Sequence, residues 1–489
     1  MGKRKYEQDS GDSDFQSNYT SKRVGQASKK RTKPANEPPS SAVLHARTAH
    51  IINQTEINPI RTALLAWFST VHDSRQMPWR KAFNPSLTPD EKAQRAYEVW
   101  ISEIMLQQTQ VATVIPYYNR WMEKFPTIHA LANASIDEVN ALWKGLGYYS
   151  RASRLLAGAK KAVGDFGGRL PNNAKDLQTH IPGIGRYSAG AISSIAYGEN
   201  APVLDGNVTR LLSRFLALNA PPKAKSTLDT LWSAAGAMVA GLSVIGPDAQ
   251  FPGDVNQALI ELGSTVCKVR DPNCDSCPLR PWCTAATNPT LAPAPAQLPD
   301  IEDLCTLCAP LPDGADASSF PMRAEKKKAR EELDIVCLLE WRRGSDRRFL
   351  LVRRPQGGLL AGLSEFPTSA NVSTKITPAK QNKIPAQLLA DLVGGGGIQK
   401  IETMGEVVHI FSHIKKTYRV LWAVLDKTDD PPAPCGEGSP CWVPFDDVAD
   451  KKLVGMLRCS SLLIAPNSIG TGVVKIWNLC KSRWDEEEE

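Results

Sequence analysis

Two carboxylic acids stand in surroundings that suit acid–base chemistry. Glu103 is flanked by Trp, Ile, Met and Leu in the run Trp-Ile-Ser-Glu-Ile-Met-Leu. Burial without a positive partner favours the neutral acid, so Glu103 is expected to keep a proton near neutral pH. Asp205 precedes Gly-Asn, and we expect it to be ionised. One protonated and one ionised carboxyl group is the division of labour in O-glycosidases. In isolation, a half-buried surface acid would be the favoured interpretation of Glu103.

A glycine-rich turn lies upstream of Asp205. Residues 181–185 read Ile-Pro-Gly-Ile-Gly and lead into the small-residue segment 188–196, which is expected to form a closely packed helix. Gly183 and Gly185 would let backbone amides approach a phosphate at a helix N-terminus. This pattern is typical of a helix-hairpin-helix clamp on a nucleic-acid backbone. The glycines alone would favour an ordinary turn between two helices, and the position of Asp205 downstream is what favours the clamp.

Four cysteines follow with the spacing C-x6-C-x2-C-x5-C, at Cys267, Cys274, Cys277 and Cys283. The chain has 11 cysteines in all, an odd number that fits a reducing compartment better than a disulfide framework. Four closely spaced thiolates can bind an iron–sulfur cluster or a tetrahedral zinc ion. The spacing alone leaves both open.

Charge is a weaker indication of the partner. The net charge is +7, but residues 1–50 hold ten Lys or Arg against five acids, a net of +5. Most of the excess therefore lies in one tail, and charge favours nucleic-acid binding only slightly. No apolar run of 18 residues and no secretory leader are evident, so we expect an intracellular protein without a membrane span.

Composition divides the 489 residues into five parts. We expect a disordered basic tail over 1–50, a helical domain over 51–287 with a metal loop at 267–283, a linker over 288–332, an α+β domain over 333–480 and an acidic tail over 481–489. Lys3-Arg4-Lys5 and the basic cluster at 29–33 predict a nuclear localisation or loose contact with DNA. A mitochondrial form is left open.

These features together resemble the helix-hairpin-helix superfamily of DNA base-excision glycosylases, and within it the adenine DNA glycosylases of the MutY type. The match is specific over residues 57–290, where Leu-Gln-Gln-Thr-Gln follows Glu103, and looser over 333–480. It implies an all-α helix-hairpin-helix glycosylase domain with a 4Fe-4S cluster loop, followed by an α+β Nudix-like domain. A metal-binding Glu-rich run is missing from residues 368–385, so we expect that domain to recognise the lesion rather than hydrolyse.

The resemblance implies a role for each catalytic residue. Glu103 would protonate adenine and later activate water, Asp205 would stabilise the cationic sugar, and Tyr187 and Asn207 would position these groups. In endonuclease III relatives a lysine that attacks the sugar occupies the position of Tyr187, and tyrosine cannot form a Schiff base. We therefore expect a monofunctional enzyme. The alternatives are a bifunctional glycosylase/lyase for oxidised pyrimidines and a catalytically silent lesion-binding protein.

The resemblance also implies the binding residues. The substrate would be double-stranded DNA with adenine opposite 8-oxoguanine or guanine, bound by a monomer, and the linker would bind repair or replication proteins. The residues expected at the DNA and the lesion are Gln107, Gln108, Thr109, Tyr148, Gly183, Gly185, Phe411, Ser412 and His413, and those at the adenine pocket are Trp79, Arg80 and Glu261. Tyr148 would be the ring that separates the bases.

Cys305 and Cys308 form a second, shorter cysteine pair inside the linker. Some animal members of the family are thought to hold zinc through additional cysteines near this place. Here Leu298 and Ser213 stand where further cysteine ligands would be expected. We therefore expect two free thiols.

Overall fold

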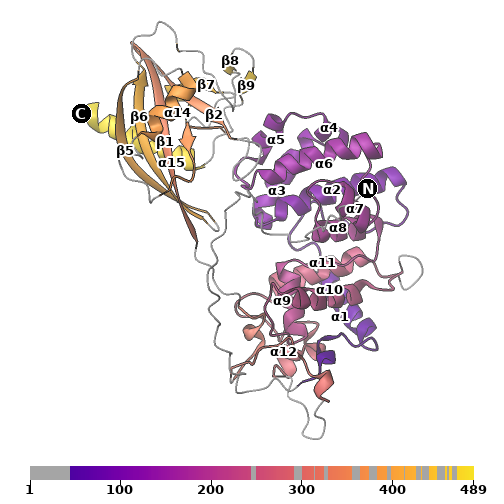
Figure 1. Cartoon of the computed structure of the whole chain (residues 1–489). Coiled ribbons are helices and arrows are strands. Elements are labelled where there is room, and N and C mark those ends of the chain that lie inside the picture. Colours follow the sequence, from indigo (N-terminus) through magenta and orange to yellow (C-terminus); the bar gives the residue numbers. More distant parts are fainter. Residues whose placement is uncertain are drawn as a thin grey trace, which may run out of the picture. The chain divides into compact units, whose positions relative to one another are not determined.

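The structure is a computed structural model, and it describes residues 45–243, 249–290, 300–312, 314–323, 329–354, 364–373, 383–393, 398–411, 414–425, 431, 440–448, 457–459, 462–464 and 471–488. The chain forms two compact units (Figure 1). The first comprises residues 1–133 and 154–325, and the second comprises 134–153 and 326–489. Each unit is described by itself below.

The first unit is helical. Its elements are η1 (Arg47–His50), α1 (Ile57–Val71), α2 (Pro89–Leu106), α3 (Val111–Lys124), α4 (Ile128–Ala132), α7 (Ala174–His180), α8 (Arg186–Ile192), the π-helical turn η2 (Ser193–Tyr197), α9 (Gly206–Phe215), α10 (Lys225–Val239), α11 (Pro252–Thr265), η3 (Arg280–Trp282), α12 (Thr284–Thr287), η4 (Ile301–Asp303) and η5 (Ala317–Ser319). Helix α6 (Ser150–Phe166) begins in the second unit and continues into the first.

Helix α2 is the central element of this unit. It begins at a capping box, in which Thr88 and Glu91 satisfy each other's backbone amides, with Pro89 at the first helical position. Its second half is buried on nearly all sides, and α8 and η2 pack against it. A helix so enclosed places any polar side chain it carries in an apolar environment.

The apolar-periodic segment 96–125 forms two helices joined by a turn. Helix α2 ends at Leu106 and α3 begins at Val111. Between them Gln108 has φ +56°, a left-handed conformation that a continuous helix cannot contain. Apolar periodicity continues across this turn and does not reveal one residue of changed backbone conformation.

The second unit is an α+β domain around a mixed sheet. Its elements are α5 (Ile136–Trp143), β1 (Arg330–Arg343), β2 (Asp346–Arg353), β3 (Ser364–Glu365), β4 (Thr368–Ser369), α14 (Ile384–Val393), β5 (Ile398–Ile410), β6 (Ile414–Leu425), β7 (Cys441–Pro444), η6 (Phe445–Asp447), β8 (Leu457–Cys459), β9 (Leu462–Ile464) and α15 (Thr471–Glu488). The strand order is β3-β2-β1-β6-β5, with β4 on β1 and β7 on β2. Strands β1 and β6 are parallel, and the other pairs are antiparallel.

Two helices cover the two faces of this sheet, because alternate residues of a strand point to opposite sides. Val336 and Leu338 of β1 pack in a core with residues of α15. Their neighbours Ile335 and Cys337 pack in a second core with residues of α14. The α+β character expected of the C-terminal domain is confirmed by these strands and helices.

Several expected domain boundaries are wrong. Residues 45–50 are part of the folded first unit, with His45 and His50 buried, whereas residues 1–44 lie outside the described part. Residues 300–325 of the expected linker also belong to the first unit, and residues 134–153 group with the second. Composition could not predict these boundaries, because they depend on contacts between distant segments of the chain.

The expected boundary between the α+β domain and an acidic tail, at residue 480, is also wrong. Helix α15 continues to Glu488, and Trp484 is buried in the core that it forms with Phe349 and Phe445. The run of acids hid this helix in the sequence, although Trp477 and Trp484 are seven residues apart and so share one helical face.

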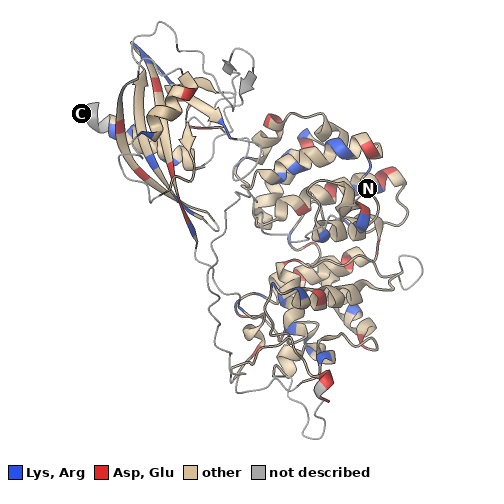
Figure 2. Ribbon diagram, in the orientation of Figure 1, with Lys and Arg blue, Asp and Glu red and all other residues tan. Residues whose placement is uncertain are grey.

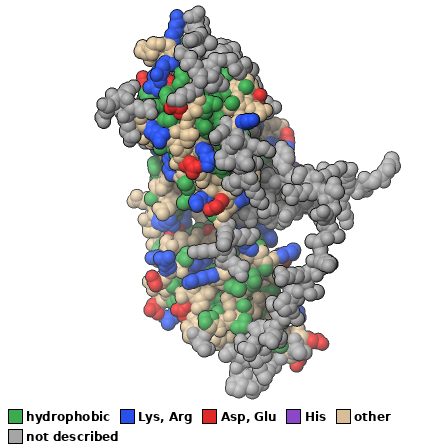
Figure 3. Space-filling view, turned by 60° about the vertical axis from the view of Figure 1, so that its left-hand side comes forward, with side chains coloured by type: hydrophobic (Ala, Val, Ile, Leu, Met, Phe, Trp, Pro, Cys, Tyr) green, Lys and Arg blue, Asp and Glu red, His purple; other side chains and the backbone are tan. Residues whose placement is uncertain are grey.

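Charged residues are spread over both units. Figure 2 shows Asp and Glu interspersed with Lys and Arg on helices and strands alike. On the face drawn in Figure 3, the described basic side chains lie among hydrophobic and acidic ones. No described helix has the length and apolar character needed to cross a membrane. Charge therefore gives little information about the site, which has to be found from its chemistry.

Trp484→Ala should destabilise the second unit, because it removes a buried indole from the core between α15 and the sheet. The expected loss is about 3–5 kcal/mol in the free energy of unfolding. Urea unfolding of the full-length chain measures this, with the exposed Ser482→Ala as the control. If Trp484→Ala lost no more unfolding free energy than Ser482→Ala, the domain would end at residue 480, as the sequence predicted.

Candidate active site

Glu103 lies in the last turns of α2, with only 9% of its surface exposed. The Tyr187 hydroxyl donates a hydrogen bond of 2.8 Å to its Oε2 atom. Tyr187 is the second residue of α8, directly after the glycine turn, so the contact between α2 and α8 brings the two groups together. Burial raises the pKa of Tyr187 well above its ordinary value. The phenol is therefore neutral, and its hydroxyl group acts as a hydrogen-bond donor to Glu103.

The pKa of Glu103 is raised to about 7. Burial is the largest cause, and the charge of Asp205 raises the pKa further, while the hydrogen bond from Tyr187 and the charge of Arg80 lower it. A carboxyl group with this pKa can give up or accept a proton near neutral pH. The predicted effect of burial agrees with the structure, but the expectation that Glu103 has no positive partner was wrong.

Asp205 is the N-cap residue of α9. Its carboxylate accepts hydrogen bonds of 2.7 Å from the Val208 backbone amide and 2.8 Å from Asn207 Nδ2. Burial raises the pKa of Asp205, and these two donors act against that shift. Because a helix N-terminus carries partial positive charge, it also favours the ionised carboxylate. Asn207 thus orients Asp205, as expected from the sequence.

A close contact between α8 and the segment before α9 sets the position of Asp205. A Cβ atom on Gly190 would lie 2.2 Å from the Pro202 carbonyl oxygen. Any larger residue would force α8 away from residues 202–204. The small residues of α8 thus allow the close packing that keeps Tyr187 and Asp205 near Glu103.

Arg80 and Glu261 form a buried ion pair near Glu103. Arg80 Nη2 donates to Glu261 Oε2 at 2.7 Å, and both side chains are at most 7% exposed. Arg75 Nη1 lies 3.3 Å from the same carboxylate, a contact that the sequence did not reveal. Trp79 is buried beside them, with its ring 5.2 Å from that of Tyr118. Carboxylate, guanidinium and indole groups together can recognise a planar polar ring.

The glycine turn lies between α7 and α8, as expected for a helix-hairpin-helix element. Gly183 has φ +83°, and a Cβ atom there would lie 2.7 Å from Arg154 Cβ. Glycine is therefore required at this position. Gly185 has φ −90° and is the N-cap of α8, so its backbone conformation is open to other residues.

The other predicted binding residues lie on turns. Gln107, Gln108 and Thr109 form the turn between α2 and α3, four to six residues after Glu103. Tyr148 belongs to the second unit, where its ring is 48% exposed and its φ is +48°. An exposed ring on a tight turn is what contact with stacked bases requires.

Phe411 directly follows β5, and β6 begins at Ile414, so Phe411 stands at the end of a strand. The Phe411 amide donates to the Ile414 carbonyl at 2.8 Å. The ring of Phe411 lies 4.4 Å from that of His409. Ser412 and His413 lie outside the described residues.

The four predicted cysteine ligands line one cavity. Cys267, Cys274, Cys277 and Cys283 surround it together with Arg214. Four thiolates around one cavity could hold an iron–sulfur cluster or a tetrahedral zinc ion.

Two arginines of α9 connect this cavity with the acids, and the sequence analysis missed both. Arg210 donates to Asn207 Oδ1 at 3.0 Å and to the Cys267 carbonyl at 2.9 Å. Arg214 Nη1 lies 3.2 Å from Cys267 Sγ and donates to the Lys268 carbonyl at 2.6 Å. Their spacing of four residues places them on one face of the amphipathic helix α9, and this spacing could have indicated them.

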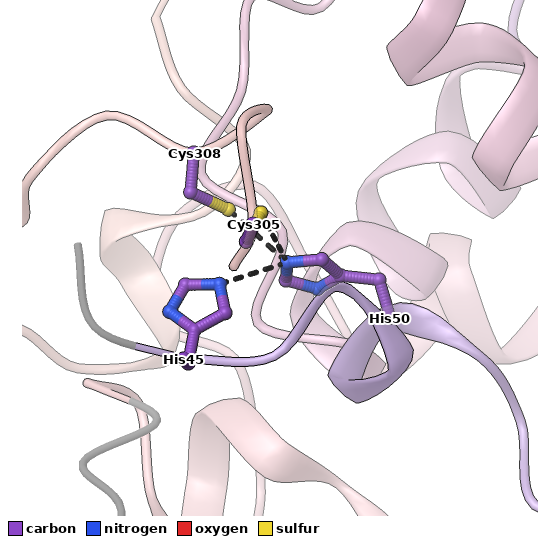
Figure 4. Close-up of side chains that lie close together, drawn as sticks. All are labelled: His45, His50, Cys305 and Cys308. Carbon is purple, nitrogen blue, oxygen red and sulfur yellow. Dashed lines mark hydrogen bonds between the residues drawn. The ribbon is translucent and has the colours of Figure 1, made fainter. Parts of the chain in front are cut away.

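Cys305 and Cys308 do not line this cavity and lie beside two histidines instead. His50 Nε2 lies 3.1 Å from His45 Nε2, 3.4 Å from Cys305 Sγ and 3.2 Å from Cys308 Sγ (Figure 4). The four ligand atoms lie within 4.8 Å of one another, so these side chains could also hold a metal ion. Cysteine spacing could not indicate this group, because His50 lies 255 residues before Cys305.

Comparisons with known proteins agree with this fold. Residues 101–235 match the model of the HhH-GPD superfamily of base excision DNA repair proteins, and residues 337–456 match that of the NUDIX domain. The chain is 41% identical to the adenine DNA glycosylase of Homo sapiens over 79% of this chain and 71% of that protein, and 41% identical to that of Mus musculus over 81% and 76%. A solved thermostable thymine-DNA glycosylase is 24% identical, with a TM-score of 0.38 over 47% of this chain and 96% of that one.

The fold and these matches define a helix-hairpin-helix base-excision protein with an additional Nudix-like domain. The identity to curated relatives over most of both chains goes further. The chain belongs to the family of adenine DNA glycosylases.

Glu103→Gln should stabilise the protein at alkaline pH. The folded pKa of about 7 exceeds the ordinary 4.5, so the folded state binds more protons than the unfolded chain between these values. Stability contributed by this group is therefore lost as pH rises from 4.5 to 7. The variant avoids a cost of about 3 kcal/mol at pH 8, at 1.36 kcal/mol per pKa unit.

Thermal unfolding at pH 5 and pH 8 measures this difference. The gain of Glu103→Gln over the wild type should be small at pH 5 and large at pH 8, whereas Glu123→Gln, an exposed control on α3, should show no such dependence. An equal effect at both pH values would mean that Glu103 titrates as an ordinary carboxyl group.

Proposed function

We propose that this chain is a monofunctional DNA glycosylase that removes adenine paired with 8-oxoguanine or with guanine in double-stranded DNA. The observation that carries the proposal is the buried Glu103 carboxyl group, bonded to Tyr187 and close to Asp205, in a member of the adenine DNA glycosylase family. Two carboxyl groups with different surroundings can divide the work of breaking a glycosidic bond.

Glu103 acts first as the general acid. Adenine is a poor leaving group until its ring is protonated, and the neutral form of Glu103 can supply that proton. Tyr187 donates to one oxygen of the carboxyl group, which leaves the other oxygen free to carry the proton toward the base. After the base has left, the Glu103 carboxylate accepts a proton from the attacking water.

Asp205 acts on the sugar. Loss of adenine leaves positive charge on the deoxyribose, and an ionised carboxylate stabilises that charge or bonds to the sugar transiently. Val208 and Asn207 keep the Asp205 carboxylate oriented through their hydrogen bonds. Tyr187 has no amine, so no Schiff base forms with the sugar and the strand stays intact.

Recognition of the base and of the DNA is assigned to several places. Trp79, Arg80 and Glu261 would line the adenine pocket, and the segment 107–109, Tyr148, Gly183 and Gly185 would contact the duplex. Phe411, Ser412 and His413 would inspect the base opposite adenine. The exposure of Tyr148 and the position of Phe411 at a strand end support these assignments.

The loop at 267–283 would hold a 4Fe-4S cluster through Cys267, Cys274, Cys277 and Cys283. The four cysteines that line one cavity support this assignment. When bound, such a cluster cross-links the loop through four iron–thiolate bonds. Arg210 donates hydrogen bonds both to the Cys267 carbonyl in this loop and to Asn207, which orients Asp205. The position of the loop would therefore influence the orientation of Asp205.

The cellular setting follows from the sequence alone. The basic clusters in residues 1–44 support a nuclear localisation, and a mitochondrial form is left open. Segment 288–299 and the Lys-rich segment 323–330 are the parts of the expected linker where repair or replication proteins would bind. We propose a monomer.

Glu103→Gln should leave duplex binding nearly unchanged and abolish adenine release, because the amide keeps the shape and removes the proton donor. General acid–base assistance alone is worth roughly 100-fold to 10,000-fold. Single-turnover cleavage of a duplex with adenine opposite 8-oxoguanine measures this, with strand breaks developed by hot alkali. A near-normal rate in the variant would remove Glu103 from the mechanism, and strand breakage by the wild type before alkali would contradict monofunctional chemistry.

Purified protein should be yellow-brown and contain about four irons per chain. Cys274→Ser should lower the iron content and the folding yield, because it removes one ligand from the cavity. Cys305→Ser, a cysteine outside this loop, is the matched control and should keep its iron. Elemental analysis of anaerobically prepared protein tests this, and wild type without iron would overturn the cluster.

Ser412→Ala should reduce the preference for adenine opposite 8-oxoguanine over adenine opposite guanine. A hydroxyl and a backbone amide can satisfy the donor and the acceptor that oxidation adds to guanine. The loss should be ~1 to 3 kcal/mol of discrimination, with the rate on the guanine pair nearly unchanged. If the variant slowed adenine release from both substrates by the same factor, Ser412 would have only a structural role.

A further inference from the structure

The loop that joins α5 to α6 holds Tyr148 in an unfavourable backbone conformation. Helix α5 ends at Trp143, and α6 begins at Ser150. Between them Gly145 has φ +101°, Gly147 has φ +72° and Tyr148 has φ +48°. Glycine adopts such values readily, but a left-handed conformation is unfavourable for a residue with a side chain. Tyrosine keeps this conformation only where its surroundings hold it there.

Arg151, in the first turn of α6, supplies much of that support. Its Nη2 atom donates hydrogen bonds of 3.1 Å to the carbonyl oxygens of both Leu146 and Gly147. Its backbone amide donates to the Tyr148 carbonyl at 2.9 Å. One residue therefore binds three consecutive carbonyl groups of the loop, and the last of them belongs to Tyr148 itself.

Trp143 supports the same loop from its other end. Its Nε1 atom donates to the Gly147 carbonyl at 2.9 Å, and its own carbonyl accepts from the Leu146 amide at 3.0 Å. A carbonyl oxygen has two lone pairs, so Gly147 can accept from Trp143 and Arg151 together. Both side chains are buried. The end of α5 and the start of α6 are thus connected through the backbone of this loop.

The guanidinium group of Arg151 also lies close to two aromatic rings. Its central carbon is 5.1 Å from the centre of the Trp143 ring and 5.5 Å from that of the Tyr148 ring. A cation is attracted to a ring face within about 6 Å of its centre. Burial lowers the pKa of Arg151 to about 10, so the group stays charged at neutral pH. Arg151 thus contacts both the backbone and the ring of Tyr148.

We propose that Arg151 is a positioning residue for Tyr148, and that it holds the loop in place while the tyrosine ring enters the base stack. The inference rests on the proposed role of Tyr148 in separating the bases. Stacked bases resist separation, so insertion pushes the ring back against its own loop. A loop free to leave the left-handed conformation would turn the ring away instead. Arg151 is only 7% exposed, whereas Tyr148 is 48% exposed, so Arg151 acts through the tyrosine.

Single-turnover release of adenine by the full-length chain from two duplexes tests the inference. Both carry adenine opposite 8-oxoguanine, but in one the neighbouring bases are paired, and in the other they are mismatched, which leaves the adenine partly unstacked beforehand. Arg151→Met should slow release from the paired duplex by roughly 5- to 30-fold, because the left-handed conformation of Tyr148 is no longer held. The loss on the mismatched duplex should be much smaller. Equal slowing on both duplexes would mean that Arg151 only stabilises the fold, and overturns the inference.

A double variant shows whether Arg151 acts through Tyr148. Arg151→Met combined with Tyr148→Ala should release adenine no more slowly than Tyr148→Ala alone, and additive losses overturn the inference. Lys160→Met removes an exposed charge from α6 and should behave as wild type. A wild type that releases no adenine contradicts the proposed function, and the inference falls with it. An unchanged rate of Tyr148→Ala on the paired duplex overturns the role of Tyr148 and this inference, and leaves the proposed chemistry intact.

Arg151→Lys keeps the test decisive if Arg151→Met fails to fold. Lysine keeps the positive charge but lacks the planar guanidinium group that reaches the loop carbonyls and the two rings together. Release from the paired duplex should therefore be slower than in the wild type, by a smaller factor than in Arg151→Met, and release from the mismatched duplex should stay close to normal. A wild-type rate of Arg151→Lys on the paired duplex, or equal slowing on both duplexes, overturns the inference.

Discussion

The account depends on the desolvation of one carboxyl group. Glu103 is held inside α2's apolar surroundings, where its charged form is costly. Burial alone would raise its pKa further, and the group would then give up its proton to the base less readily. The hydrogen bond from Tyr187 and the charge of Arg80 offset part of that cost and leave the pKa at about 7. The same group can then serve as acid and as base within one cycle.

The groups that set the pKa of Glu103 lie on separate elements of the fold. Helix α2 carries the acid, α8 brings Tyr187 directly after the glycine turn, and the start of α9 presents Asp205. The close approach of Gly190 to Pro202 fixes the second and third elements against each other. Glu261 pairs with Arg80, so the positive charge near Glu103 is moderated rather than dominant. Small changes in this packing would change the acidity of Glu103.

Much of this site could be predicted because its information is local. Glu103 among apolar neighbours, the glycines of the turn and the spacing of the four cysteines are each contained in a short stretch of sequence. The α+β character of the second unit was also readable from strand-like runs. What these features share is that their physical cause lies within a few residues.

Other features depend on contacts between distant parts of the chain, and short-range patterns cannot reveal them. Arg75 and Arg80 meet Glu261 across about 180 residues, and His50 meets Cys305 across 255. The acidic end of α15 was taken for a tail, although Trp484 is buried in the core. The break at Gln108 depends on the backbone conformation of one residue, which apolar periodicity does not encode.

The pH dependence of adenine release in Tyr187→Phe tests the central claim most directly. The variant loses the donor that lowers the pKa of Glu103 and keeps the ring and its packing. In single-turnover experiments the wild-type rate should fall as pH rises through about 7, where Glu103 loses its proton. In Tyr187→Phe this fall should move to higher pH, whereas Tyr197→Phe, whose hydroxyl bonds to the Leu170 carbonyl, should behave as wild type. An alkaline limb that stays in place, or moves to lower pH, would contradict control of the reaction by a buried Glu103.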